Sequence, residues 1–114
     1  MKAIRVHEFG PPEVMRYEDV PDPLPGPGQV VVELAAVGVN PVDTYIRSGL
    51  YQPDRQRPYT PGLDGAGEIV AVGAEVRHRH LGQRVYVAWS ISGTYAQKVL
   101  CKEFQTHPLP DGIS

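Results

Sequence analysis

Four polar or aromatic residues lie close together between positions 40 and 51: Asn40, Asp43, Tyr45 and Tyr51. An amide, a carboxylate and two phenols around an apolar shelf are the usual makeup of a small-ligand pocket. A helix that begins at Asn40 places Asn40 and Asp43 near its N-terminus, with Tyr45 about half a turn further on. Tyr51 follows a glycine that can end the helix, so it can fold back over the same region.

The same residues also have a purely structural interpretation. Asn40 can cap the helix, and Asp43 can interact with the positive end of the helix dipole. Tyr45 can belong to the core. These residue types and spacings alone therefore leave a pocket and an ordinary helix start as alternatives.

A glycine pair further along the chain resembles a cofactor motif. Gly65-Ala66-Gly67 begins like the phosphate-binding fingerprint of dinucleotide-binding domains. The third glycine of that fingerprint would fall at position 70, which is valine, and strand-like residues follow where a helix is needed. We expect these glycines to let strands pack closely at a bend. The chain then has no cofactor-anchoring module of its own.

Metal binding and nucleophilic catalysis have weak candidates. His78 and His80 are two residues apart, but the arginines beside them oppose a divalent cation. The single cysteine, Cys101, lies in an apolar strand context in which thiols are usually inert. The serines lack the strand-turn-helix context of a nucleophile elbow. We predict no metal site and no serine or cysteine nucleophile.

The helix that would position the four residues has clear boundaries. Asn40 suits the N-cap, Pro41 the first helical position, and Gly49 a left-handed stop. Three apolar or aromatic residues fall on one face at helical spacing: Val42, Tyr45 and Ile46.

Short strands are expected on both sides of this helix. Residues 29–37 form the strongest one, and their nearly continuous apolar run indicates burial on both faces. The prolines between 21 and 27 mark an extended connector. Further strands are expected over residues 2–9, 14–18, 65–72, 83–89 and 93–101. Many turns, several short strands and one brief helix indicate a mainly β, barrel-like domain.

Length and composition narrow the function classes. The chain has 114 residues, a net charge of −2 and one cysteine, which fits a single domain and excludes an intramolecular disulfide. This charge does not favour nucleic acid or anionic lipid. No apolar run is long enough to span a bilayer, and the charged N-terminus lacks the features of a secretory signal. We expect a cytoplasmic protein.

Four segments closely resemble the quinone oxidoreductase and zeta-crystallin branch of the zinc-independent medium-chain dehydrogenase/reductases. They are AVGVNPVDTYIRSGLY (36–51), PYTPGLDGAG (58–67), GQRVY (82–86) and SISGTYA (90–96). The resemblance runs from Met1 to the end of the chain, and the block from Asn40 to Gly49 is its most specific part. It implies a chaperonin-10-like (GroES-like) catalytic domain, a distorted β-barrel with short helices, over residues 1–107. Residues 108–114 would begin a linker to a Rossmann domain that lies beyond this polypeptide and binds NADPH.

The resemblance also implies an activity: reduction of quinones by hydride or electron transfer from NADPH, without zinc. The alternatives are an enoyl or alkenal reductase of the same superfamily and a non-catalytic truncated barrel. The longer protein would be a homo-oligomer, and this fragment alone would be nearly inactive.

Roles for individual residues follow from the same resemblance. Asn40 would lie beside the nicotinamide and the substrate, Tyr45 would contact the coenzyme, and Tyr51 would line the quinone pocket. Asp43 would hold Asn40 or Arg47. The related zinc alcohol dehydrogenases have cysteine, histidine and glutamate ligands where this chain has Asn40, Leu63 and Asp64. Because leucine cannot bind a metal, the resemblance favours the zinc-independent branch.

Overall fold

The structure is a computed structural model that describes residues 1–110 and 112. Strands dominate it, with one α-helix among the described residues. In chain order the elements are β1 (Lys2–Val6), the 3-10 turn η1 (Pro12–Val14), β2 (Met15–Asp19), β3 (Gln29–Val37), α1 (Pro41–Ser48), β4 (Asp64–Val72), β5 (Arg84–Ala88), β6 (Lys98–Lys102), the 3-10 turn η2 (Glu103–Gln105) and β7 (Thr106–Pro108). No helix in this part of the chain has the length and apolar character needed to cross a membrane.

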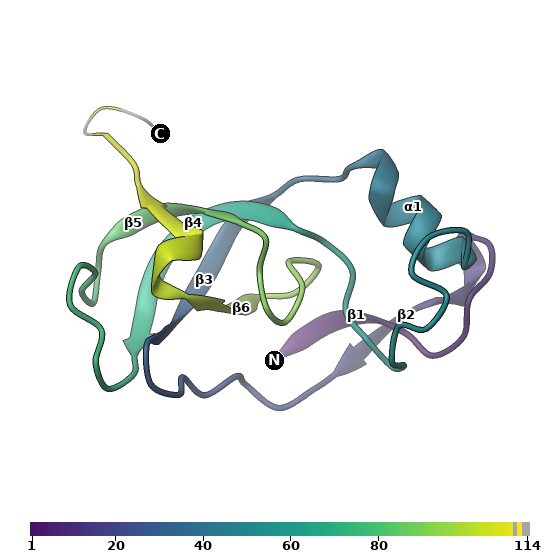
Figure 1. Ribbon diagram of the computed structural model, residues 1–114, viewed down its shortest axis with the longest axis horizontal. Helices are drawn as coiled ribbons and strands as arrows, with labels where there is room; N and C mark the ends of the chain where they lie inside the picture. Colours follow the sequence, from purple (N-terminus) through teal and green to yellow (C-terminus); the bar gives the residue numbers. More distant parts are fainter. Residues whose placement is uncertain (111, 113–114) are drawn as a thin grey trace.

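Two antiparallel sheets build the domain. The larger has the strand order β6-β3-β4-β5-β7 and curls into a half-barrel, while β1 and β2 form a hairpin at one side (Figure 1). Single bridges from Ala3 to Ala96 and from Val6 to Tyr59 join the hairpin to the segments around it. The expected mainly β, distorted barrel-like domain with one brief helix is confirmed for the described residues.

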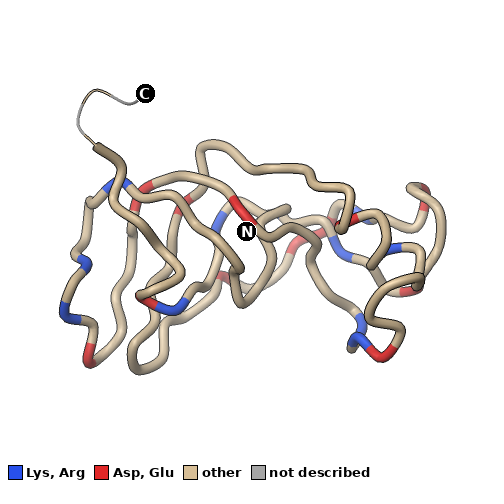
Figure 2. Tube along the Cα trace, turned by 45° about the horizontal axis from the view of Figure 1, so that its top comes forward, with Lys and Arg blue, Asp and Glu red and all other residues tan. Residues whose placement is uncertain are grey.

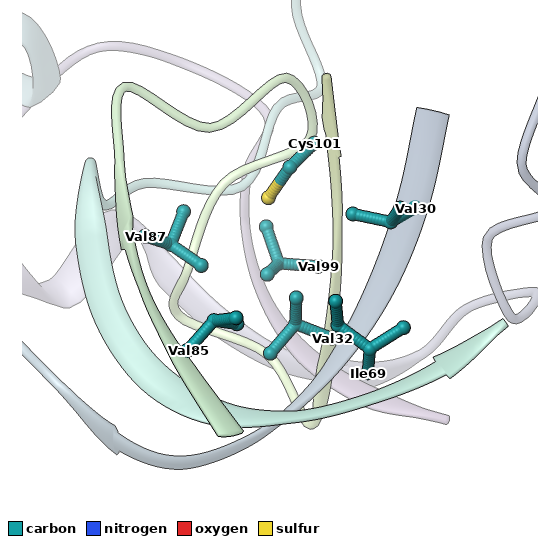
Figure 3. Packing of buried hydrophobic residues seen from close by; sticks show 7 residues of the cluster. All are labelled: Val30, Val32, Ile69, Val85, Val87, Val99 and Cys101. Atoms are coloured by element: carbon teal, nitrogen blue, oxygen red, sulfur yellow. The ribbon is translucent and has the colours of Figure 1, made fainter. Parts of the chain in front are cut away.

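The main core lies inside the curl of the larger sheet, where side chains from four strands point toward one another (Figure 3). Its members are Val30, Val32, Ile69, Val85, Val87, Val99 and Cys101. All but the cysteine are β-branched, the type that packs well on a pleated surface. Burial of each such side chain contributes roughly 1.5–3 kcal/mol.

A second, smaller core supports α1. Val6 of β1, Ile46 of α1 and Tyr59 are buried together there. The fold therefore places its helix at one end, on a small apolar base separate from the barrel core.

Lys and Arg residues are interspersed with Asp and Glu along the trace (Figure 2).

The strand expected to be buried on both faces, β3, is so only in its first half. Val30, Val31 and Val32 are all buried, but from Glu33 onward every residue is exposed or only partly buried. The pairing of β3 with β4 shifts register at two points, between Val31 and Val32 and again past Leu34. The prediction of two-sided burial was thus wrong for residues 33–37, because this half of β3 extends past the barrel core toward α1.

The C-terminal strands also differ from expectation. The strand predicted over residues 93–101 begins only at Lys98 in the structure, because residues 90–97 turn to meet β1 through Ala96. The short strand β7 was not predicted. Pro108 belongs to it, and the backbone N–H of Leu109 still donates to the Arg84 carbonyl at 3.0 Å. The expected linker over residues 108–114 lies partly outside the described residues and stays a prediction.

The glycines at positions 65 and 67 lie within β4, and the next element is a strand. A Cβ atom on Gly67 would lie 1.9 Å from the carbonyl oxygen of Glu33 on β3. No real side chain tolerates such a contact, so a glycine is required for the two strands to approach. The structural interpretation of this pair, close packing of strands, is confirmed.

Cys101 should be inert in the folded protein. Burial raises the pKa of its thiol to about 12, so almost none of the reactive thiolate exists near pH 8. We expect labelling by a thiol reagent to be at least about 100-fold slower in the native state than in urea. Equal rates would contradict this burial.

The same thiol gives a pH dependence of stability. The unfolded cysteine loses its proton near its ordinary pKa of 9.0, whereas the native one keeps it until about 12. The contribution is therefore fully present below about pH 9, and the free energy of unfolding should fall as the pH rises from 9 toward 12. Urea titrations at several pH values measure this free energy. Over this range it should fall more steeply with pH for the wild type than for a Cys101→Ala variant.

Candidate functional site

The start of α1 is fixed by a backbone cap. Asn40 occupies the N-cap with extended backbone, and the Asp43 Oδ2 atom accepts a hydrogen bond from the Asn40 backbone N–H at 2.9 Å. Pro41 takes the first helical position, and Gly49 ends the helix at φ 85°. The predicted helix and both of its boundaries are confirmed.

Asp43 is the buried member of this group. Its Oδ2 also accepts a hydrogen bond from the Tyr95 hydroxyl at 3.1 Å. Burial and the adjacent negative charge of Asp43 raise the pKa of Tyr95 to about 12, so this phenol keeps its proton and acts as a donor. Asp43 thereby ties α1 to the segment before β6, 52 residues away.

The Asn40 side chain contacts a different element, the strand β4. Its Nδ2 donates to Oδ1 of Asp64 at 3.1 Å. Gly38 makes room for this contact, because a Cβ atom there would lie 2.1 Å from the same Asp64 oxygen. Among the described residues, no group of three or more His, Cys, Asp or Glu side chains is arranged to hold a metal. The Asn40–Asp64 pair is a direct amide–carboxylate hydrogen bond.

The two tyrosines of the predicted site are half-exposed, at 51% for Tyr45 and 52% for Tyr51. The backbone N–H of Tyr51 donates to the Tyr45 carbonyl at 3.2 Å, so the chain does fold back onto the last turn of α1. The expected apolar helix face was wrong in part: Ile46 is buried, but Asp43 takes the other buried position and Tyr45 points outward. The face of α1 that turns toward the interior is therefore set by the hydrogen bonds of Asp43 more than by the spacing of its apolar residues.

The structure brings together Asn40 and Asp43, but it does not enclose all four predicted residues in one cavity. A cavity of about 220 Å³ beside α1 is lined by Val39, Asp43, Arg47 and Tyr95, among others. Asn40, Tyr45 and Tyr51 are not in its lining. Tyr45 and Tyr51 therefore lie half-exposed outside this cavity, and Asn40 lies part-buried between α1 and β4.

Two residues of the site, Asp64 and Tyr95, were not among the predicted site residues. Both lie in segments that carry the family resemblance, which was the available signal. Their partners are 24 and 52 residues away in sequence, and nothing in the local pattern pairs them. Trp89 also stands out, since it is 69% exposed with φ 63°, directly after the residue that pairs with Asp64.

Gly38→Ala should break the Asn40–Asp64 contact. The new methyl group would displace the Asp64 carboxylate, because no side chain can approach within 2.1 Å of it. We expect a loss of about 1–2 kcal/mol in the free energy of unfolding. Asn40 is the sole asparagine in the sequence, so its side-chain amide can be followed by NMR. Unchanged amide resonances in the variant would contradict the predicted displacement.

Comparisons with known proteins agree with this architecture. The Alcohol dehydrogenase GroES-like domain family matches residues 26–111. The chain belongs to this family. Its sequence is 50% identical over 111 residues to the quinone oxidoreductase of Lama guanicoe, covering 96% of the chain and 34% of that protein.

Solved structures resemble this GroES-like domain closely. Quinone oxidoreductase from Pseudomonas syringae pv. Tomato DC3000 superposes with a TM-score of 0.93 at 40% identity, over 99% of the chain and 34% of that structure. Escherichia coli quinone oxidoreductase complexed with NADPH gives a TM-score of 0.95 at 36% identity, over 100% of the chain and 35% of that structure. The chain spans about a third of the length of the relatives it matches.

Proposed function

We propose that this chain is the catalytic-domain part of an NADPH-dependent quinone oxidoreductase that works without zinc. The observation that carries the proposal is the direct hydrogen bond from Asn40 to Asp64. In the zinc-dependent relatives, metal ligands are expected at these positions. Here an amide and a carboxylate satisfy one another, in a domain whose similar proteins are named quinone oxidoreductases.

The exposed groups of the site fit a nicotinamide ring. Nδ2 of Asn40 has a second hydrogen beyond the one given to Asp64, and its Oδ1 is an acceptor, so the amide can pair with another carboxamide. Tyr45 offers a half-exposed aromatic face with a polar tip. When bound, the dihydronicotinamide supplies the hydride, while the protein supplies position and polarity.

Asn40 is held in place before any ligand arrives. Its backbone N–H donates to Asp43 and its side-chain Nδ2 donates to Asp64, so the residue is fixed at both its backbone and its side chain. Such preorganisation means that little orientational freedom remains to be lost on binding. Tyr51 would present its ring to the quinone and its hydroxyl to a quinone oxygen. Asp43 acts through Asn40 and is a positioning residue.

Removal of zinc is expected to leave the quinone reductase activity of the longer protein unchanged. Leu63 carries no ligand atom, and Oδ1 of Asp64 is already engaged by Asn40. Dialysis of the longer protein against a strong chelator should leave its quinone reductase rate within about twofold of the untreated sample. A loss of activity that added Zn²⁺ restores would overturn the zinc-independent assignment.

The activity itself is tested by following NADPH consumption with a naphthoquinone acceptor. The longer protein that contains this chain should turn over, whereas residues 1–114 alone should not, because they leave the site open on one side. Robust turnover by the 114 residues would contradict the need for a second domain. A marked preference for an alkenal over the quinone would favour the enoyl or alkenal reductase alternative.

Two further features belong to this proposal. We expect the longer protein to be a cytoplasmic homo-oligomer. Analytical ultracentrifugation of that protein tests the second point, and a clean monomer at high concentration would contradict it.

A further inference from the structure

A small hollow lies beside the buried carboxylate of Asp43. It offers about 10 Å³ that a water-sized sphere can occupy, which is close to the room needed for one water molecule. Its lining includes Asp43, Tyr59, Arg55 and the residues from Pro61 to Leu63. Asn40, Tyr45 and Tyr51 do not line this hollow.

Tyr59 brings an unpartnered hydroxyl to this part of the fold. The residue is only 8% exposed, and its Oη atom is buried without a hydrogen bond to any described residue. Its backbone is fixed by paired hydrogen bonds with Val6, at 2.8 Å and 3.2 Å. The Arg55 guanidinium lies 4.5 Å from the ring centroid and holds the ring from one side. Because a buried hydroxyl without a hydrogen bond is costly, this one requires a partner.

Asp43 has an oxygen atom that can accept a hydrogen bond in this part of the fold. Both of its hydrogen bonds, from the Asn40 backbone and from Tyr95, fall on Oδ2. Its Oδ1 accepts none of the hydrogen bonds described for this residue, which is 5% exposed overall. This oxygen can therefore accept a further hydrogen bond. Burial raises the pKa of Tyr59, with a smaller contribution from the charge of Asp43, so the phenol keeps a proton to donate.

We propose that one water molecule binds in this hollow, accepting a hydrogen bond from Tyr59 Oη and donating one to Asp43 Oδ1. Pro61, Gly62 and Leu63 also line the hollow, and a buried water typically makes about three hydrogen bonds. Tyr59 is then a positioning residue that acts on Asp43 and, through Asp43, on the backbone of Asn40. This inference rests on the geometry of this chain and does not require the proposed function.

The test is Tyr59→Phe, which removes the hydroxyl and keeps the ring. If the water is bound, the variant loses a satisfied hydrogen bond, and Tm should fall by about 3–6 °C. If the hydroxyl is instead unpartnered, its removal relieves a buried polar group and Tm should rise or stay constant. The two outcomes differ in sign, and a rise or no change would overturn the proposal. Tyr17→Phe is the matched control, since that tyrosine is 70% exposed and should show no shift.

Two readouts separate positioning from a general loss of stability. Hydrogen exchange at the backbone N–H of Asn40 should become about fivefold faster in Tyr59→Phe, while backbone amides in the barrel core keep their exchange rates. A high-resolution crystal structure of the wild type should show an ordered water within hydrogen-bond distance of Tyr59 Oη and Asp43 Oδ1, and the variant should lack it. Absence of that water in the wild-type crystal would refute the proposal even if the variant failed to fold.

Discussion

Asn40→Ala should lower kcat/KM for NADPH-dependent naphthoquinone reduction about 100-fold in the longer protein, the cost of misplacing a reacting group by about 1 Å. The substitution removes the side-chain amide that donates to Asp64, while the backbone N–H that donates to Asp43 remains. It also leaves the Asp64 carboxylate without its partner beside Gly38. Steady-state rates at varied quinone and NADPH concentrations measure the effect.

The control for this variant is Gln56→Ala. Gln56 is an exposed amide-bearing residue with no hydrogen bond to the rest of the described chain, so its loss should leave kcat/KM unchanged. Thermal unfolding of both variants shows whether the folded fraction is comparable. A value of kcat/KM for Asn40→Ala within twofold of wild type would remove Asn40 from the proposed site.

Gly67→Ala should strongly destabilise the barrel. Its Cβ would lie 1.9 Å from a backbone oxygen of β3, so the two strands would have to separate. Because β3 and β4 carry much of the main core, we expect the free energy of unfolding to fall by about 3 kcal/mol or more. Urea denaturation followed by circular dichroism measures the change.

Gly82→Ala is the matched comparison. It has open space around its Cβ position and only a left-handed backbone, with φ 83°, to penalise a side chain. Its cost should stay near 1 kcal/mol. Equal destabilisation by the two substitutions would show that strand proximity is not what requires a glycine at position 67.

Local signals in the sequence predicted the elements around the site well. The cap, proline and stop of α1 are all adjacent in the chain, and each acts through the backbone of its own neighbours. The bounds of β3 also agreed with the structure, because an uninterrupted β-branched run has few other conformations available. Features that depend on residues within about ten positions of one another could therefore be predicted from the sequence.

Contacts between segments far apart in the sequence could not be predicted in this way. The partners of Asn40 and Asp43 depend on how β4 and the segment before β6 curl back toward α1. The outward position of Tyr45 follows from the inward hydrogen bonds of Asp43, which helical spacing does not reveal. The resemblance to a family marked the right segments, but only the fold shows which atoms meet.

A crystal structure of the longer protein with NADPH bound tests the central claim most directly. The account predicts that the nicotinamide lies against Asn40 and Tyr45, with the Asn40–Asp64 hydrogen bond intact and no metal between them. A nicotinamide bound on another face of this domain, or a metal ion held between Asn40 and Asp64, would contradict it.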